Sequence, residues 1–484
     1  MDQGRLTQGD ITRQLIALSG PLLLGNILQQ LYNAVDAVIV GQFVGSTAFG
    51  AVGVAGSVMN LFLFLISGGC DGVGTLLAQF CGGDNRSAFR REFFLSGIFG
   101  AGASLVLTAL GLLALEPLLA LLRTPDSVAV CARAYLQIIF LGFPAAFAFH
   151  LSSRVLRAVG NTRAGLAFLA LSMGVNLALD LVLVAGLSMG VQGAALATVL
   201  AQALAALLCG GYLRLRFPQL MFGREDMVLD LPLLRRTARF SAVTALHMCN
   251  LYIGKLLVQG AVNSLGEEAI NAFTAATRVE GFANSFGDSG AEATAIFTGQ
   301  NTGAGQGGRV REGFRRGQRL LLGLGAFMSL VMLLWAEPCL RLVLPAGSPL
   351  GPGAGYLRTV ACFYVFNFLG SGLAGYFRGR GRVSLPVIGA TGHISLRVLL
   401  SFLLTPAMGL PAVGLATGLG WMGVVTFWYI LAGVTCAGPP ERRKPPLKIV
   451  HSEQSGLFFS GPLDKIGEVR YDRAHTSRMG CTSK

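Results

Sequence analysis

Residues 21–44, PLLLGNILQQLYNAVDAVIVGQFV, form an apolar run that is long enough to cross a bilayer as a helix and that contains one carboxylate, Asp36. A helix needs about 20 residues to span the hydrocarbon core, so Asp36 would lie inside the membrane. The polar residues of this run fall within one third of the helix circumference: Asn26, Gln29, Gln30, Asn33 and Asp36. A charge at mid-bilayer costs at least about 2.5–3.5 kcal/mol. We therefore expect this polar stripe to line an ion or substrate pathway.

The whole chain has the composition of a membrane protein. Of its 484 residues, 53% are hydrophobic and only 13% are charged, whereas soluble domains carry about 25% charged residues. Twelve apolar segments are predicted as spans, near residues 15–40, 49–79, 93–115, 129–151, 164–186, 189–212, 238–262, 270–300, 317–336, 356–375, 384–406 and 411–436. The polar residues 1–13 lead into a full-length span, so we expect the first span to be an uncleaved anchor.

The formal net charge of +14 is concentrated in alternate connections between the predicted spans. Arginines gather between spans 2 and 3, 4 and 5, 6 and 7, 8 and 9, and 10 and 11: Arg86, Arg90, Arg91, Arg154, Arg157, Arg163, Arg214, Arg216, Arg224, Arg235, Arg236, Arg239, Arg309, Arg311, Arg315, Arg316, Arg319, Arg378, Arg380 and Arg382. This positive-inside pattern predicts cytoplasmic termini and cytoplasmic even-numbered connections, in the plasma (inner) membrane. The arginines are interpreted as topology determinants that could also touch anionic lipid, and nucleic acid is not an expected partner.

Neither the cysteines nor the glycine-rich stretches indicate a cofactor. The nine cysteines are scattered without a C-x-x-C pair, and they are interpreted as small core residues. The phosphate-binding motif GxxxxGK[ST] does not occur in the sequence. We therefore expect no ATPase and no bound cofactor, so that any pumping would draw on an ion gradient or on a partner.

The chain contains an internal repeat with a single offset of 221 residues. The offset pairs identical or similar residues of the two halves: Gly69 with Gly290, Asp71 with Glu292, Gln79 with Gln300, Gly82 with Gly303, Arg157 with Arg378, and Gly193 with Gly414. The halves are residues 1–213 and 238–436, each with six spans, and residues 214–237 are the cytoplasmic connection between them. An even number of spans returns the chain to the same side, so we expect parallel repeats with pseudo-twofold symmetry about the membrane normal. Residues 437–484 are expected to be a basic, disordered cytoplasmic tail.

Several stretches resemble one transporter family. They are LTQGDITRQLIALSGPLLLGNILQQLYNAVDAVIVGQFVGSTAFGAVGVAG (6–56), the paired LRAVGNTR (156–163) and FRGRGRV (377–383), and NLALDLVLV (176–184). Together they look like the multidrug and toxic compound extrusion (MATE) transporters, over about residues 5–436. The resemblance implies an all-α integral membrane protein of twelve transmembrane helices, whose two six-helix bundles, the N-lobe and the C-lobe, enclose a central cavity. It also implies export of small organic, often cationic, compounds by alternating access, driven by proton or sodium entry.

A second buried carboxylate is predicted in span 5, where Ser172, Asn176 and Asp180 recur every four residues and so share one helix face. Asp36, Asn176 and Asp180 match the N-lobe cation site of similar MATE proteins. Two carboxylates in one desolvated pocket repel each other, so this site could take up and release a proton near neutral pH, and its oxygens would equally suit sodium. The alternative is two independent carboxylates, each capped by nearby hydroxyls and amides.

The other charges within the predicted spans are candidates for the cavity lining. They are Asp71, Lys255, Glu280, Asp288, Glu292 and Arg397. Asp71 and Glu292 lie in the glycine-rich GGCDGVG and GDSGAEA, which indicate discontinuous helices, so these carboxylates either line the cavity or cap helix breaks near the membrane surface. An intramembrane base more often neutralises a carboxylate than binds a ligand, and we expect an ion pair between Arg397 and Glu280. Arg397 occupies the repeat position of Asn176, so the N-terminal half is expected to be the one suited to cation coupling.

The favoured function is a secondary active antiporter for small organic substrates that works as a monomer in the bilayer and is not an enzyme. One alternative is a flippase for a lipid-linked oligosaccharide, which should have a more basic central cavity. Another is a membrane-embedded transferase, which should place acidic or histidine clusters at the water interface. The N-terminal half is acidic, and His150, His247 and His393 are isolated, so the antiporter is preferred.

Overall fold

The computed structural model describes residues 6–44, 46–121, 124–344 and 349–437, without the side chains of some helical positions, among them 33–38. The described residues belong to one compact unit, Met1–Gly438. Within them every regular element is helical. The predicted tail lies outside the described residues from position 438 onward.

We describe the helices in two groups, before and after residues 217–230. The first group, which we call the N-half, consists of α1 (Ile11–Phe43), α2 (Ser46–Gly82), α3 (Arg86–Leu121), α4 (Asp126–Leu141), α5 (Phe143–Ala158), α6 (Thr162–Asp180) and α7 (Gly190–Arg216). The second group, the C-half, consists of α8 (Leu231–Asn263), α9 (Glu267–Gly303), α10 (Gly307–Leu334), α11 (Ala336–Arg341), α12 (Gly351–Ala361), α13 (Tyr364–Gly379), α14 (Ser384–Met408) and α15 (Leu410–Ala437).

The number of spans agrees with the sequence. Nine helices of the described residues are long and apolar enough to cross a membrane. Two further spans are bent pairs, in which α4 meets α5 at 50° and α12 meets α13 at 54°. The twelfth is α9, which has 37 residues and is more polar because it carries Glu280, Asp288 and Glu292. The prediction of an all-α protein with twelve spans in two repeats is confirmed.

The helix breaks lie in other spans than predicted. The bends fall at Gly142 and Phe363, which are 221 residues apart and so are repeat mates. In contrast, α2 and α9 run without interruption through Asp71 and Glu292, so the predicted breaks there are wrong. The glycines serve close packing instead, because a Cβ on Gly72 would collide with the backbone of α8.

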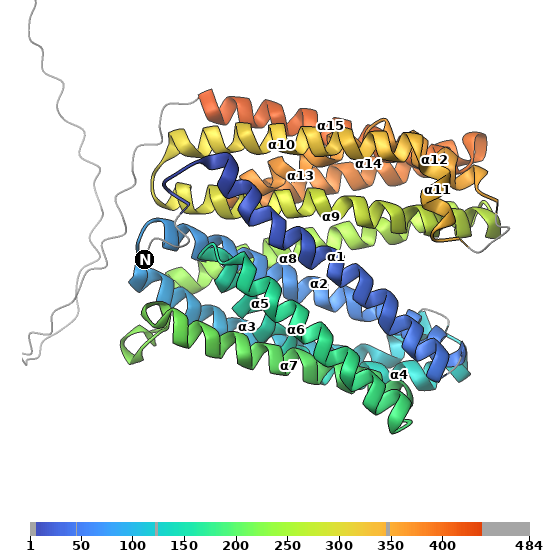
Figure 1. Cartoon of the computed structure of the whole chain (residues 1–484), viewed down its shortest axis with the longest axis horizontal. Helices are drawn as coiled ribbons and strands as arrows, with labels where there is room; N and C mark the ends of the chain where they lie inside the picture. Colours follow the sequence, from blue (N-terminus) through green and yellow to red (C-terminus); the bar gives the residue numbers. More distant parts are fainter. Residues whose placement is uncertain (1–5, 45, 122–123, 345–348, 438–484) are drawn as a thin grey trace, which may run out of the picture. The chain divides into compact units, whose positions relative to one another are not determined.

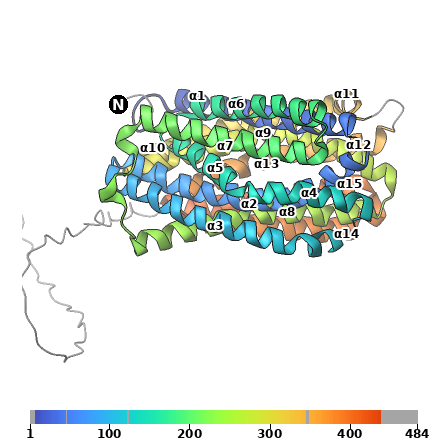
Figure 2. The same ribbon diagram turned by 90° about the horizontal axis from the view of Figure 1, so that it is seen from below.

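The two halves lie side by side with α2, α8 and α9 between them. In Figure 1 the helices α10, α13, α14 and α15 lie on one side of this centre, and α3, α5, α6 and α7 lie on the other. Figure 2, turned by 90°, shows that α6 and α7 lie along one edge of the N-half and α2 and α3 along the opposite edge. Each half has its own apolar core, one around Phe140 and one around Tyr356.

The first helix of each half begins against the other half. Leu15 of α1 packs with Phe297 of α9, and Thr237 of α8 donates a hydrogen bond to the buried Glu92 carboxylate of α3, at 2.8 Å. Later turns of α1 contact α6, and later turns of α8 contact α14. The halves are therefore interlocked at the end where α2 and α9 finish and where α3 and α10 begin. We call this the arginine-rich end, because the predicted topology arginines cluster there.

At the arginine-rich end, α2 crosses α9 at a pair of repeat-mate glycines. A Cβ on Gly82 would overlap the carbonyl oxygen of Gln300, and a Cβ on Gly303 would overlap that of Gln79. The same glutamines bind across the interface in a symmetric way. Gln79 donates to the Gly379 carbonyl at 3.0 Å, and Gln300 donates to the Ala158 carbonyl at 2.7 Å.

Candidate functional site

The predicted face of span 5 is a buried polar cluster on α6. Asn176 is 2% exposed and Asp180 is 1% exposed. The orientation of the Asn176 amide follows from the groups around it: its nitrogen donates to the Asp180 carboxylate at 3.1 Å and to the Tyr32 hydroxyl of α1 at 2.6 Å. Its oxygen accepts from the Thr198 backbone N–H of α7 at 3.0 Å. The cluster therefore ties three helices of the N-half together.

A helical irregularity follows this cluster directly. Residues Leu181–Gly186 form a π-helical turn that begins next to Asp180. Such turns widen the helix and are frequent at functional sites. The sequence analysis identified Asn176 and Asp180, but it did not single out Tyr32 or Thr198. Tyr32 could have been found, because it lies one turn before Asp36, whereas nothing in the apolar sequence of α7 marks Thr198.

Two predicted members of the first-helix stripe, Asn33 and Asp36, lie on α1 where the structure describes no side chains. The described part of the stripe faces the other half. Asn26 donates to the Ser289 hydroxyl of α9 at 3.1 Å. Gln29 is half-buried and Gln30 is exposed. At Asn26, the first residue of the polar stripe, α1 therefore faces α9.

The C-half has a separate polar cluster around Glu280 of α9. Glu280 is 8% exposed, and it accepts a hydrogen bond from the Tyr356 hydroxyl at 3.0 Å. One turn later, Asn284 accepts from Tyr364 at 2.6 Å and from Asn367 at 2.7 Å. These contacts hold α9 against α12 and α13 on its C-half side.

The predicted ion pair between Arg397 and Glu280 is wrong. Among the described residues Glu280 forms no ion pair within 4.0 Å, and its hydrogen bond from Tyr356 takes that place. Arg397 acts on Glu280 through longer-range electrostatics. The physical reason is that the fully buried Tyr356 hydroxyl lies between the two charges: it donates to Glu280 and also interacts with Arg397.

Lys255 of α8 and Asp288 of α9 are both exposed. Asp288 lies on the face of α9 that meets the N-half, because Gly281, two turns earlier, lies beside α1 and Glu292, one turn later, pairs with α5. Asp288 is also within electrostatic range of Lys255. That Asp288 lines the central cavity stays a prediction.

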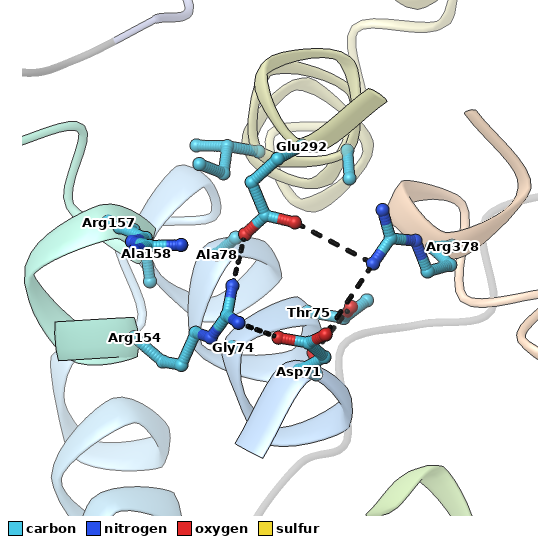
Figure 3. Close-up of a pocket in the computed structure, with 11 residues that line it drawn as sticks. Asp71, Gly74, Thr75, Ala78, Arg154, Arg157, Ala158, Glu292 and Arg378 are labelled. Carbon is cyan, nitrogen blue, oxygen red and sulfur yellow. Dashed lines mark hydrogen bonds and ion pairs between the residues drawn. The ribbon is translucent and has the colours of Figure 1, made fainter. Parts of the chain in front are cut away.

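The strongest group of charges joins the two halves, and we call it the interhalf cluster. It consists of Asp71 of α2 and Arg154 of α5 from the N-half, with Glu292 of α9 and Arg378 of α13 from the C-half (Figure 3). Arg154 lies 2.5 Å from Asp71 and 2.8 Å from Glu292. Arg378 lies 3.6 Å from Glu292 and 3.9 Å from Asp71.

The interhalf cluster surrounds a small cavity of about 20 Å³ that Arg157 also lines, which is room for a single water molecule. Asp71 and Glu292 therefore line this small cavity, and they cap no helix break. That they line the central substrate cavity stays a prediction. Arg154 and Arg378 were interpreted as topology determinants, and the structure shows that their side chains do not lie at the surface. Their side chains are only 14% and 11% exposed and they bind carboxylates between the helices.

A bundle of twelve membrane spans in two repeats, with buried charges where the repeats meet, defines a multi-pass membrane transporter. The family model described as MatE matches residues 21–182 and 244–403. The chain is 27% identical over 420 residues to the probable multidrug resistance protein YpnP of Bacillus subtilis, covering 86% of this chain and 93% of that protein. It is 28% identical over 334 residues to the probable multidrug resistance protein YoeA of the same organism, covering 67% and 72%.

The fold is also that of solved transporters. A multidrug resistance MATE family transporter in an outward-facing conformation superimposes with a TM-score of 0.84 at 20% identity, covering 90% of this chain and 98% of that one. The chain belongs to the MatE family, whose members are transporters and not enzymes.

Proposed function

We propose that this protein exports small organic compounds, cationic ones among them, across the plasma membrane in exchange for protons or sodium ions. The observation that carries the proposal is the buried cluster of Asp180, Asn176 and Tyr32. It places a carboxylate and an amide beside the helix that bears Asp36, one turn after Tyr32. The relatives YpnP and YoeA are named as probable multidrug resistance proteins, which supports export of small compounds.

The chemistry of coupling follows from burial. An ionised carboxylate out of water is costly unless a cation or hydrogen bonds compensate it. A proton on Asp36 or Asp180, or a sodium ion held by their oxygens, supplies that compensation. A cationic substrate can supply it as well, so the ion and the substrate compete for the same negative charge. In the outward-open state the substrate is released to the outside and the ion binds from the same side. The ion is then released to the cytoplasm in the inward-open state.

The orientation belongs to the same proposal. The arginine-rich end faces the cytoplasm, and both termini and the connection 214–237 lie on that side, in keeping with the positive-inside pattern. A single chain contains both repeats, so a monomer is the transporting unit. The coupling ion is the only inorganic partner, and no cofactor takes part.

The test is export by purified protein in lipid vesicles, with a fluorescent organic cation as substrate and with a proton or a sodium gradient imposed separately. Asp36→Asn should abolish gradient-driven export, and Asp180→Asn should have a similar but milder effect. Changing a residue that only supports the direct ligands of an ion typically weakens ion binding about 10–100-fold. Loss of a direct ligand should weaken it by at least as much. The double variant should be little worse than Asp36→Asn, because the two residues act as one unit.

The matched control is Glu116→Gln, which neutralises an exposed carboxylate paired with Arg133 within the N-half. Both kinds of variant keep the side-chain shape, so all should insert and fold. Normal gradient-driven export by Asp36→Asn would show that the proposed coupling site is wrong. Comparison of the two gradients in wild type then decides between proton and sodium.

A further inference from the structure

The interhalf cluster has an alternating arrangement. Each arginine contacts one carboxylate of its own half and one of the other half: Arg154 contacts Asp71 and Glu292, and Arg378 contacts Glu292 and Asp71. Figure 3 shows the four side chains in a closed ring, in which carboxylates and arginines alternate. Two of the four contacts therefore stay within a half, and two cross between the halves.

This arrangement lowers the cost of separating the halves. An unpaired charge in a low-dielectric interior is strongly unfavourable. If the halves part, Asp71 keeps Arg154 and Glu292 keeps Arg378, so no carboxylate is left bare. Only the two cross contacts, Arg154 with Glu292 and Arg378 with Asp71, must break.

The cluster lies deep in the closed interface. Eleven residues separate Asp71 from Gly82 on α2, and eleven separate Glu292 from Gly303 on α9, which is about 16 Å along each helix. The symmetric hydrogen bonds of Gln79 and Gln300 lie between these two levels. The sealed region thus extends from the glycine crossing at the arginine-rich end inward to the charged ring.

We propose that Asp71, Arg154, Glu292 and Arg378 form the inner gate of the transporter. Their two cross contacts form when the halves close at the arginine-rich end and break when that end opens. They are positioning residues, since they act on the relative placement of the halves and not on the coupling ion or the substrate. The inference rests on alternating access, as the proposed function has it, but its test does not depend on which ion drives export.

The test is a distance measurement by pulsed electron paramagnetic resonance. Spin labels go on Arg86→Cys and Gly307→Cys, in a background without the native cysteines that still exports. These are the exposed first residues of α3 and α10, and they are repeat mates at the arginine-rich end. Wild type without a gradient should show mainly the short distance of the closed gate. Glu292→Gln should raise the ratio of long to short distances about tenfold, as expected for loss of the charged hydrogen bond from Arg154. Arg378→Gln should raise the ratio by a smaller factor, because its cross contact with Asp71 is an ion pair at 3.9 Å without a hydrogen bond.

Arg157→Gln is the matched control. Arg157 lines the same cavity, but among the described residues it has no ion pair within 4.0 Å and acts on Glu292 and Asp71 only through longer-range electrostatics, so its loss should change the ratio by less than Glu292→Gln does. Glu292→Asp, which keeps the charge on a shorter side chain, should give an intermediate ratio and guards against a variant that merely misfolds.

Unchanged distances in folded Glu292→Gln and Arg378→Gln would overturn the gate. Loss of export by these variants at wild-type distances would overturn it too, because the cluster would then belong to the coupling path. An equal shift in Arg157→Gln would likewise count against it. Failure of the proposed function would appear elsewhere, as normal export by Asp36→Asn, and would leave the measured distances as they are.

Discussion

The N-half and the C-half share a backbone plan but differ in the chemistry placed on it. Tyr135 of α4 and Tyr356 of α12 are repeat mates, 221 residues apart, and each hydroxyl is directed at the same repeat position on a neighbouring helix. In the N-half that position is Met59, whose sulfur lies 4.0 Å from the hydroxyl. In the C-half it is Glu280, whose carboxylate oxygen lies 3.0 Å away. Both halves thus keep the tyrosine contact, but its partner is a neutral sulfur in the N-half and a carboxylate in the C-half.

The proposed coupling site also differs between the halves. The repeat mates of Asn176 and Asp180 are Arg397 and Ser401. A buried amide and carboxylate in one half thus correspond to a guanidinium and a hydroxyl in the other. In contrast, Gln79 and Gln300 make equivalent bonds on both sides of the interface. The glutamines that join the halves are shared, whereas Asn176 and Asp180 have no counterpart of the same chemistry in the C-half.

The largest effect is expected when the repeat mates Asn176 and Arg397 are each replaced by the residue of the other half. Asn176→Arg gives the N-half the residue of the C-half and places a guanidinium beside Asp180. This cation would occupy the negative charge that the coupling ion needs, so gradient-driven export should fall about 100-fold or more. The reverse change, Arg397→Asn, should leave the dependence of export on the ion gradient intact. Export by everted membrane vesicles measures both.

Asn176→Leu guards against a folding defect in this experiment, because it removes the amide without adding a buried charge. It should also lose coupling. If Asn176→Arg kept full coupling, or if Arg397→Asn abolished it, the halves would not be specialised as this comparison holds.

The sequence predicted the parts of the fold that depend on pattern. The 221-residue offset and the arginine distribution were sufficient for two repeats of six spans. The helix breaks were not predicted correctly, because a glycine in a helix can either allow close packing of a continuous helix or allow a bend. Gly72 gives room for the backbone of α8 to approach a continuous helix, whereas Gly142 lies at a bend. Composition alone does not distinguish these uses, although Pro144 next to the bend was a local signal.

The site was predictable where its residues share one helix. Asn176 and Asp180 lie one turn apart, and the structure brings them into contact. The interhalf cluster was missed because it depends on tertiary packing. Arg154 and Arg378 lie near predicted connections, where charge counting assigns them to the membrane surface. Nothing in the residues around them indicates that their side chains are buried between α2, α5, α9 and α13.

The next expected effect concerns the feature that the halves share. Gly82→Ala and Gly303→Ala each add a Cβ that would overlap a backbone carbonyl at the crossing of α2 and α9. Backbone atoms cannot rotate away, so each change should lower the free energy of unfolding by about 2–3 kcal/mol. The two values should be similar, because the glycines are repeat mates in one crossing. Denaturant titration in detergent, followed by tryptophan fluorescence, measures them.

Gly97→Ala on α3 is the control for this pair. A Cβ there meets nothing within 4 Å, and alanine in a helix is favoured over glycine by about 0.5–1 kcal/mol. The control should therefore be neutral or stabilising. A clear inequality between Gly82→Ala and Gly303→Ala would mean that the crossing is less symmetric than its contacts indicate.

The smallest effect separates the paired tyrosines. Tyr356→Phe removes the hydroxyl that donates to the buried Glu280, and a hydrogen bond to a charged group contributes about 1.5–3 kcal/mol. We therefore expect unfolding to become easier by about 1.5 kcal/mol. Tyr135→Phe removes a hydroxyl that contacts the neutral Met59 sulfur at 4.0 Å, and this sulfur is a weak acceptor, so the change should lower stability by less than Tyr356→Phe does. Both rings remain, and both sites are buried, at 0% and 3% exposure, so packing loss is matched and the difference reports the polar contacts of the two hydroxyls. Equal effects in the same denaturant titration would show that Glu280 does not depend on Tyr356, and the divergence between the halves would then lie in the coupling residues only.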